Sequence, residues 1–274
     1  MLAPGPGQLL IIGGAEDKEG ECRILRDFVH LSGGREARIA ILAVAAADQG
    51  EAGELYREVF LRLGAGEVQR LLVPDRSMAR SPQVVEAVRR ATAVFFPGGD
   101  QLRVTSLLGG TPLEDALRDA FRQGAVVGGT SAGAAAISDT MIVTGDSDDA
   151  PQKCTTKLAP GLGLLEETVI DQHFAQRGRL GRVLSALAQN PHILGIGVDE
   201  DTALRVGPDG KSWVLGSRTV TVVDGRGITH TNASEACQED PLALSDVRLH
   251  ILPAGYGFDL NTRTPLLPPA RSEN

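Results

Sequence analysis

Short apolar runs alternate with stretches of helical periodicity through the first half of the chain. The apolar runs predict strands at 9–12, 39–44, 68–73 and 93–96. The periodic stretches predict helices at 19–29, 51–63, 84–90 and 113–122. This alternation is typical of a parallel sheet covered by helices. We therefore expect an α/β fold in which a mostly parallel sheet carries helices on both faces.

The last of these helices has clear boundary signals. Thr111 is a typical N-cap, Pro112 stands at the first helical position, and Glu114 completes a capping box. Gly124 marks the C-terminal stop, which places the next strand at 125–127. The serine that follows this strand is therefore predicted to lie on a strand-to-helix turn.

The pattern changes to period two after about residue 200. The segments 202–206, 211–216 and 219–223 alternate in polarity between turn residues, which predicts antiparallel hairpin strands appended to the parallel core. No Ser-rich or Pro-rich linker divides the chain, so we expect residues 1–274 to form a single domain. The tail from about residue 266 is Pro-rich and then polar, and we expect it to be disordered.

The charge balance argues against several classes of partner. The 274 residues carry 27 basic and 35 acidic side chains, and this net charge of −8 disfavours binding to nucleic acid or to an anionic membrane. The longest apolar run, 39–47, is too short to span a bilayer, and the first residues lack the basic region of a signal peptide. Three separated cysteines suit a reducing cytoplasm and argue against a zinc site. We expect a soluble cytoplasmic protein without a metal.

The turn after residue 127 carries the first candidate for chemistry. Residues 129–133 have the sequence G-T-S-A-G, which fits the G-x-S-x-G elbow that exposes a serine hydroxyl above a sheet. In a glycine-rich chain, the same pattern also suits close packing of a helix on a sheet. Ser131 is therefore a candidate nucleophile that requires a base and an orienting acid.

His173 is the best placed of the five histidines, because it follows the apolar run 168–170 at a predicted strand end. The other four are better explained as surface or structural residues. For the acid, Asp199, Glu200 and Asp201 follow another apolar strand, and their spacing does not choose among them.

A third strand end offers backbone donors. Gly98 and Gly99 follow the apolar strand at 93–96, and a turn of this kind can direct a backbone N–H toward a developing oxyanion. The residue after the nucleophile, Ala132, would supply the second donor. The sequence does not decide which of the two glycines contributes.

Five motifs around these residues occur in a fixed order: FFPGGDQ at 95–101, GGTSAGAAAISDTMI at 128–142, DQHFAQRGRLGR at 171–182, GIGVDEDTAL at 195–204 and LPAGYGFDL at 252–260. Together they closely resemble the cyanophycinases, a serine exopeptidase family related to the aspartyl dipeptidase called peptidase E. The resemblance extends over about residues 9–260, nearly the whole chain. The Asp-rich segment 145–156 matches no motif of the family.

The resemblance implies a fold similar to the class I glutamine amidotransferases, with a serine in place of their cysteine. By motif position, Ser131 would be the nucleophile, His173 the base and Glu200 the orienting acid, with oxyanion donors at Gly99 and Ala132. Cyanophycinases cleave cyanophycin, a poly-aspartate whose side chains carry arginine, and release β-Asp-Arg dipeptides through an acyl-enzyme. The resemblance implies no cofactor. These enzymes are often dimers, so we expect a homodimer.

Six polar residues near the motifs are candidate substrate-binding residues. They are Gln101, Asp171, Gln172, Arg177, Arg179 and Arg182. The three arginines can bind substrate carboxylates in bidentate fashion, and Arg179 and Arg182 would share one face of a helix. Asp171 is the candidate partner for the substrate's own arginine, and the two glutamines are neutral hydrogen-bonding groups.

Two other functions stay open at this point. One is an α-aspartyl dipeptidase resembling peptidase E, which is disfavoured because those enzymes are shorter and lack the arginine-rich run after the histidine. The other is a relative without catalytic activity that binds arginine-containing or acidic peptides. A glutamine amidotransferase domain would need a cysteine at position 131, but the cysteines stand at positions 22, 154 and 237.

Overall fold

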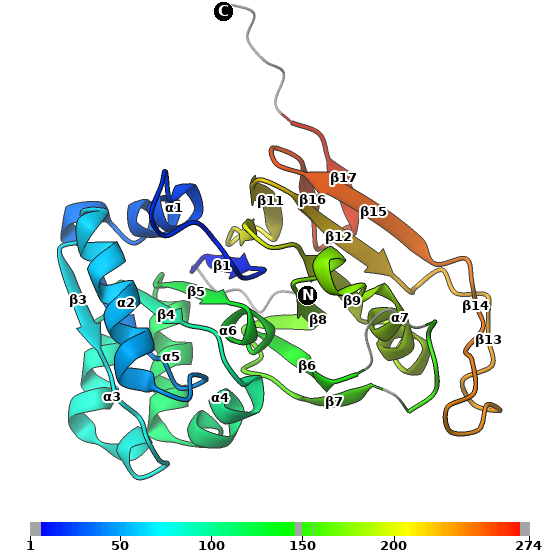
Figure 1. Cartoon of the computed structure of the whole chain (residues 1–274), viewed down its shortest axis with the longest axis horizontal. Helices are drawn as coiled ribbons and strands as arrows, with labels where there is room; N and C mark the ends of the chain where they lie inside the picture. The colour runs from blue at the N-terminus through cyan, green and yellow to red at the C-terminus, as the bar shows by residue number, and fades with distance from the viewer. Residues whose placement is uncertain (1–6, 146–149, 155, 269–274) are drawn as a thin grey trace, which may run out of the picture.

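Two β-sheets with helices packed against them make up the computed structural model, which describes residues 7–145, 150–154 and 156–268 (Figure 1). The α/β class expected from the sequence is confirmed. The sequence pattern predicted one sheet, however, and the second sheet was not foreseen.

The first sheet has nine strands in the order β17-β16-β11-β10-β1-β5-β4-β2-β3. The five strands from β1 to β3 in this order run parallel, and the other four extend the sheet antiparallel beside β1. The strands are β1 (Leu9–Ile12), β2 (Arg38–Ile41), β3 (Glu67–Arg70), β4 (Ala93–Phe96), β5 (Val126–Thr130), β10 (Thr202–Val206), β11 (Lys211–Gly216), β16 (Gly257–Asp259) and β17 (Thr264–Leu266).

The second sheet has six strands in the order β15-β12-β9-β8-β6-β7. Its strands are β6 (Ser138–Thr144), β7 (Lys157–Pro160), β8 (Leu165–Gln172), β9 (Leu194–Val198), β12 (Thr219–Asp224) and β15 (Arg248–Pro253). The sequence predicted that 219–223 would join the appended hairpin, but β12 instead pairs with β9 and β15. The short strands β13 (His230–Thr231) and β14 (Leu244–Ser245) form a separate ladder.

Helices cover both faces of the first sheet, as the apolar pattern predicted. The helices are α1 (Arg23–Leu31), α2 (Gln49–Arg62), α3 (Pro82–Arg89), α4 (Gln101–Leu108), α5 (Pro112–Arg122), α6 (Ala132–Ala135) and α7 (Leu180–Gln189). Side chains of β1 alternate between two cores: Leu10 and Ile12 pack with α1 and α2, whereas Leu9 and Ile11 pack with α3, α4 and α5. Coverage on both sides explains why the central strands are continuous apolar runs.

Helix α7 covers part of the second sheet. Val183, Ala186 and Leu187 of this helix form a third core with Val169 and Val223 of the strands. The carboxyl ends of β1 and β8 lie next to each other at the junction between the two sheets, because His173 after β8 donates its backbone N–H to Gly13 after β1. This junction is where the candidate chemistry gathers.

The first sheet ends with β17, which is paired with β16 as far as Leu266. The tail that was expected to be disordered begins at about this residue. The remainder of that prediction falls on residues 269–274, outside the described residues. In the described part of the chain, no helix is long and apolar enough to cross a membrane.

Candidate active site

Ser131 occupies a sharp turn between β5 and α6. Its backbone has φ 53° and ψ −117°, a conformation with positive φ that a residue other than glycine rarely adopts. The backbone N–H of Ser131 donates to the carbonyl of Ile12 at 3.0 Å, which fixes the turn to the end of β1. The predicted strand-to-helix position of the serine is therefore confirmed.

The two glycines of the motif allow backbones to touch at this turn. A β-carbon on Gly129 would lie 2.5 Å from the carbonyl carbon of Gly133, and one on Gly133 would lie 2.1 Å from the carbonyl oxygen of Phe96. Helix α6 can thus pack directly on β5 and β4 only because both positions lack a side chain. The G-T-S-A-G motif therefore both allows close packing of the helix on the sheet and places the serine at the turn.

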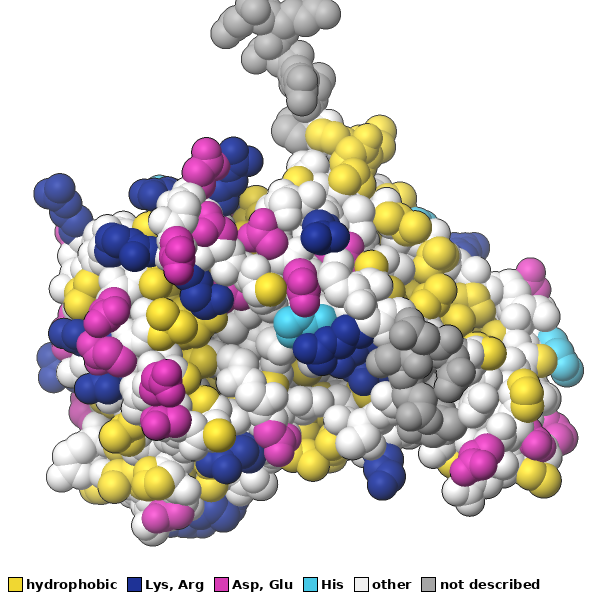
Figure 2. Space-filling view, viewed as in Figure 1, with side chains coloured by type: hydrophobic (Ala, Val, Ile, Leu, Met, Phe, Trp, Pro, Cys, Tyr) yellow, Lys and Arg dark blue, Asp and Glu magenta, His cyan; other side chains and the backbone are white. Residues whose placement is uncertain are grey.

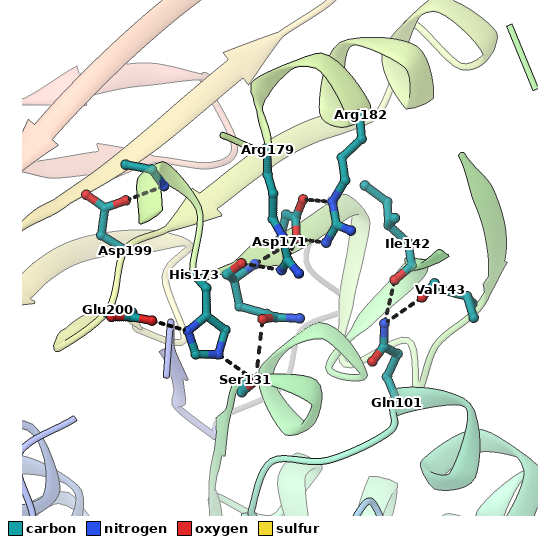
Figure 3. Close-up of polar contacts among 12 residues, drawn as sticks. Gln101, Ser131, Ile142, Val143, Asp171, His173, Arg179, Arg182, Asp199 and Glu200 are labelled. Carbon is teal, nitrogen blue, oxygen red and sulfur yellow. Dashed lines mark hydrogen bonds and ion pairs between the residues drawn. The ribbon is translucent and has the colours of Figure 1, made fainter. Parts of the chain in front are cut away.

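His173 lies directly after β8 with its imidazole against the serine. Its Nε2 is 2.9 Å from Ser131 Oγ, and its side chain is 12% exposed (Figure 3). The bare α-carbon of Gly14 makes room for the ring, because a β-carbon there would lie 2.3 Å from Cε1. The sequence pattern gave no signal for this role of Gly14.

Of the three carboxylates after β9, Glu200 is the one that reaches the imidazole. Its Oε1 lies 2.7 Å from His173 Nδ1 (Figure 3). Asp199 is buried and instead accepts hydrogen bonds from the backbone N–H of Ala175 and the hydroxyl of Thr219. Asp201 accepts from the backbone N–H of Asp17 at 3.1 Å. The geometry distinguishes residues that spacing alone could not.

The arrangement is a continuous chain of carboxylate, imidazole and hydroxyl. A carboxylate at Nδ1 favours the tautomer that carries its proton there, which leaves Nε2 free to accept the proton of a hydroxyl. A serine hydroxyl at 2.9 Å is within reach of that proton transfer. The site can therefore generate a nucleophile at Ser131.

The turn after β4 lies beside the serine. A β-carbon on Gly98 would lie 3.2 Å from Cβ of Ser131, so this glycine faces the nucleophile directly. Gly99 has φ 145°, and a β-carbon on it would lie 2.1 Å from the carbonyl oxygen of Ala45. Ala132 is the first residue of α6, where a backbone N–H has no acceptor within the helix. Both predicted sources of oxyanion donors thus lie near Ser131.

The two glutamines occupy different positions around the serine. The Oε1 of Gln172, the last residue of β8, is 3.4 Å from Ser131 Oγ. Gln101 begins α4, and its Nε2 donates to the backbone carbonyls of Ile142 at 2.7 Å and Val143 at 3.3 Å (Figure 3). The amide nitrogen of Gln101 thus holds β6 against α4.

Asp171 departs from its predicted role. Its side chain is 1% exposed, and its carboxylate accepts from Arg182 Nε at 2.5 Å, from a second nitrogen of the same guanidinium, and from Arg179 Nη1 at 3.2 Å (Figure 3). The prediction that Asp171 would meet the arginine of a substrate is therefore wrong, because the protein's own arginines already neutralise this buried carboxylate. Arg182 is committed to the same pair.

The other two arginines are less fully committed. Arg179 is 7% exposed, and its Nε has no hydrogen-bond partner among the described residues. Burial lowers the pKa of Arg179 to about 10, and the nearby Asp171 carboxylate partly opposes that shift. Arg177 is exposed in the short turn before α7. Figure 2 shows histidine, basic and acidic side chains next to one another near the middle of the face in view.

A comparison with models of known protein families assigns the chain to one of them. The model of peptidase family S51 matches residues 9–213, which is more than half of the sequence. The chain belongs to peptidase family S51. It is therefore a peptidase, a hydrolase of peptide bonds, and the matched span of this S51 peptidase includes all three residues of the carboxylate–imidazole–hydroxyl chain.

Several curated proteins resemble this S51 peptidase along most of their length. A cyanophycinase of Geminocystis herdmanii is 42% identical over 94% of this chain and 95% of that protein. A cyanophycinase of a Nostoc species is 41% identical over 94% of this chain and 87% of that protein. One from Thermosynechococcus vestitus is 41% identical over 93% of this chain and 80% of that protein.

Solved structures support the fold of this S51 peptidase. A peptidase from an acI-B1 actinobacterium superposes with a TM-score of 0.69 at 22% identity, over 92% of this chain and 96% of that one. A putative peptidase E of Listeria monocytogenes gives a TM-score of 0.53 at 12% identity, over 77% of this chain and 98% of that one. Among the described residues of the S51 peptidase, no group of three or more His, Cys, Asp or Glu side chains is placed to hold a metal ion.

Proposed function

We propose that the protein is a cyanophycinase, a serine exopeptidase that hydrolyses the poly-aspartate backbone of cyanophycin and releases β-Asp-Arg dipeptides. The observation that carries this proposal is the contact of Ser131 Oγ with His173 Nε2 at 2.9 Å, in a chain that is 42% identical to a cyanophycinase. The likeness over most of both sequences supports the substrate class, and the geometry supports the reaction type.

In the proposed reaction, Ser131 attacks the carbonyl carbon of the terminal backbone peptide bond. His173 accepts the hydroxyl proton at Nε2 as the oxygen–carbon bond forms, and Glu200 stabilises the resulting imidazolium through Nδ1. The imidazolium then donates this proton to the leaving nitrogen, the peptide bond breaks, and an acyl-enzyme remains. In the second half of the cycle, water attacks the ester carbon and gives a proton to His173; the ester bond then breaks, His173 returns the proton to Ser131 Oγ, and the product leaves with a free carboxyl group.

The tetrahedral intermediate places a negative charge on the former carbonyl oxygen. Backbone N–H groups of Ala132 and of Gly98 or Gly99 are the proposed donors to this oxygen. Their support is positional: Ala132 begins α6 directly after the serine, and Gly98 packs against Ser131. Such donors usually contribute about 10² to 10³ in kcat each.

Substrate recognition is proposed to use Arg177, which is exposed in the turn before α7 and can donate to a carboxylate of the polymer end. Arg179 is buried, and its guanidinium already donates to Asp171 and to the backbone carbonyl of Gln172. Gln172 lies within 3.4 Å of Ser131 Oγ, where its amide can bind the backbone of the scissile residue. Asp171 and Arg182 support this surface from beneath through their buried ion pair.

We also propose that the protein is a cytoplasmic homodimer. The support for the cytoplasm is that Cys22, Cys154 and Cys237 are free thiols. The support for a dimer is the apolar edge of the second sheet, where Leu249 and Ile251 of β15 are 47% and 61% exposed. Light scattering coupled to size exclusion would measure the mass, and a monomer of 28.8 kDa would contradict the dimer.

The proposed function is tested by incubating the purified protein with purified cyanophycin and analysing the soluble products by mass spectrometry. We expect β-Asp-Arg from the wild type and none from Ser131→Ala, with Ser106→Ala as a control because Ser106 is exposed on α4 away from the turn. Hydrolysis of α-aspartyl dipeptides without release of β-Asp-Arg would indicate an activity like that of peptidase E. Binding without turnover would refute the enzymatic proposal.

A further inference from the structure

Glu16 is a buried carboxylate close to the nucleophile that the proposed reaction does not use. Its side chain is 1% exposed. Three polar side chains surround it: Thr130 Oγ1 donates to Oε2 at 2.6 Å, the hydroxyl of Tyr56 donates to Oε1, and Lys18 Nζ lies 3.0 Å from Oε1. A buried carboxylate is stable only when its oxygens are hydrogen-bonded in this way. The site is therefore fully built, with partners from β5, from α2 and from the loop that holds Glu16 itself.

One of these partners connects Glu16 to the catalytic turn. Thr130 is the last residue of β5 and directly precedes Ser131. Its side chain is also buried, at 3% exposure, so its hydroxyl donates to Glu16 rather than to solvent. Because Ser131 has the unusual φ of 53°, the turn needs surrounding contacts that hold it in place. The bond from Thr130 to Glu16 is such a contact.

Glu16 belongs to a short segment, residues 13–17, that also contacts the base and the residue after the acid. The carbonyl of Gly13 accepts the backbone N–H of His173 at 2.9 Å, and the α-carbon of Gly14 lies against the imidazole. The carbonyl of Gly14 accepts the backbone N–H of Asp201, the residue after the orienting acid, at 2.9 Å. Segment 13–17 thus contacts the chain at or next to every member of the carboxylate–imidazole–hydroxyl chain.

We propose that Glu16 is a positioning residue that anchors segment 13–17 to the nucleophile turn and so keeps Ser131 in register with His173. This inference rests on the proposed function of Ser131 as nucleophile. Glu16 acts through Thr130 and the segment backbone and does not itself touch the reacting atoms. Its loss should therefore lower the rate of the chemical step and leave substrate affinity little changed.

The chemistry of the site explains why a carboxylate stands at this position. Burial raises the pKa of Tyr56 well above its usual value, and the neighbouring Glu16 raises it further, so the phenol remains a hydrogen-bond donor. Two hydroxyl donors therefore converge on two acceptor oxygens. A glutamine presents one oxygen and one NH₂ group, so one of the two hydroxyls must reorient to accept a hydrogen bond. Alanine removes both acceptors.

The test compares Glu16→Gln, Glu16→Ala and Thr130→Val by steady-state kinetics on a short β-Asp-Arg oligomer. We expect kcat to fall by roughly 10- to 100-fold in Glu16→Ala and Thr130→Val, the scale of a misplacement of about 1 Å, with KM unchanged within about twofold. Glu16→Gln should retain an intermediate rate. The rate at which phenylmethanesulfonyl fluoride labels Ser131 should fall in parallel with kcat.

Asp224→Asn is the matched control. Asp224 is also a buried carboxylate with a partner from another segment. It lies at the end of β12 away from the site, because the other end, Thr219, is the one that binds the side chain of Asp199. The Asp224→Asn substitution should lower the unfolding midpoint without lowering kcat at a temperature well below that midpoint. If Asp224→Asn lowered kcat as much as Glu16→Ala did, loss of rate would reflect general destabilisation and the inference would be overturned.

Other outcomes are equally decisive. Folded Thr130→Val and Glu16→Gln proteins that both keep wild-type kcat and labelling rates would overturn the inference. If Glu16→Ala does not fold, Thr130→Val is compared with Tyr56→Phe instead. Each of these two substitutions removes one hydrogen bond to Glu16, but only Thr130→Val removes the bond next to Ser131. Slow labelling of Ser131 in Thr130→Val but not in Tyr56→Phe supports the inference, and equal labelling rates in these two variants overturn it. A wild type that neither cleaves the oligomer nor becomes labelled would refute the proposed function itself.

Discussion

The α-carbon of Gly14 lies against the imidazole of His173, so closely that a β-carbon on Gly14 would be 2.3 Å from Cε1 and 2.5 Å from Nε2. Those two atoms border the contact between the imidazole and Ser131. The position of the base thus depends on the absence of a side chain at position 14. Space for the ring is set by backbone rather than by neighbouring side chains.

We expect Gly14→Ala to lower kcat by about 100-fold or more, because the methyl group must push the imidazole away from Ser131. Gly124→Ala is the control. Gly124 has φ 106°, close to the 102° of Gly14, but a β-carbon on it meets nothing within 4 Å. Both variants therefore carry similar backbone strain, and only one carries the clash. Equal activity in the two would contradict the steric argument.

Glu200→Gln should lower kcat by about 10⁴, because an amide at Nδ1 no longer stabilises the imidazolium and can favour the wrong tautomer. Asp201→Asn should have a much smaller effect, since this carboxylate accepts from the backbone of Asp17 instead. Asp199→Asn should mainly lower the unfolding midpoint. Steady-state kinetics and urea unfolding of the three variants separate these effects, and equal losses of kcat would remove the assignment of Glu200.

Arg182→Lys and Arg177→Lys should affect different properties. Arg182 binds the buried carboxylate of Asp171 through two nitrogens, and a lysine cannot reproduce this fork. We expect Arg182→Lys to lower the free energy of unfolding by about 1.5 to 3 kcal/mol. Arg177→Lys should mainly raise KM for the oligomer, because Arg177 is exposed and a lysine cannot bind a substrate carboxylate in bidentate fashion. An Arg177→Lys variant with wild-type KM would leave Arg177 without a role in substrate binding.

The stability of the protein should fall in acid through Asp224. Burial raises the pKa of this carboxyl group, but hydrogen bonds from Arg226 and Arg263 outweigh burial and lower the pKa below its usual value. The folded state therefore binds this proton less readily than the unfolded chain does. The stabilisation is complete above the unfolded pKa of about 3.9 and is lost as the pH falls through the lowered pKa.

Urea unfolding between about pH 6 and about pH 3 measures this effect. The unfolding free energy of Asp224→Asn should depend less steeply on pH in that range than that of the wild type. The two curves should approach each other toward the acid end, as Asp224 begins to take up its proton. Parallel curves would mean that other carboxyl groups account for the acid sensitivity.

The sequence predicted those elements best whose boundaries depend on local chemistry. Strands β1 and β4 begin and end where the apolar runs do, because they are buried on both faces. Helix α1 was expected from residue 19 but begins at Arg23, since the carboxylate of Asp17 accepts from the N–H groups of Glu19, Gly20 and Cys22 and forms a turn first. Helix α4, one of the shortest helices, was missed.

The capping box at α5 was correct only in part. Thr111 stands at the N-cap, but its hydroxyl donates to the carbonyl of Leu108. Glu114 reaches back to the N–H of Gly110, one residue before the position that the motif predicts. The residues were placed correctly, while their hydrogen bonds depended on the path of the preceding chain.

Long-range pairing was the part that periodicity could not provide. The alternating pattern of β12 is the same whether it pairs with β11 or with β9, so the second sheet had no local signal. At the site, Asp171 and Arg182 are eleven residues apart on a strand and a helix, and nothing in their spacing shows that they meet. The orienting acid was likewise chosen by resemblance, because spacing does not show which of three consecutive carboxylates the fold directs toward the imidazole.

Arg263 ties the end of the described chain to both sheets. It lies in the turn between β16 and β17 of the first sheet, and its Nη1 donates to Asp224 of the second sheet at 2.8 Å. During translation, Ser131, His173 and Glu200 leave the ribosome before Arg263 is made. The hydrogen bond between Arg263 and Asp224 can therefore form only afterwards. A nascent chain that already contains every residue of the proposed chemistry still lacks this link between the first and the second sheet.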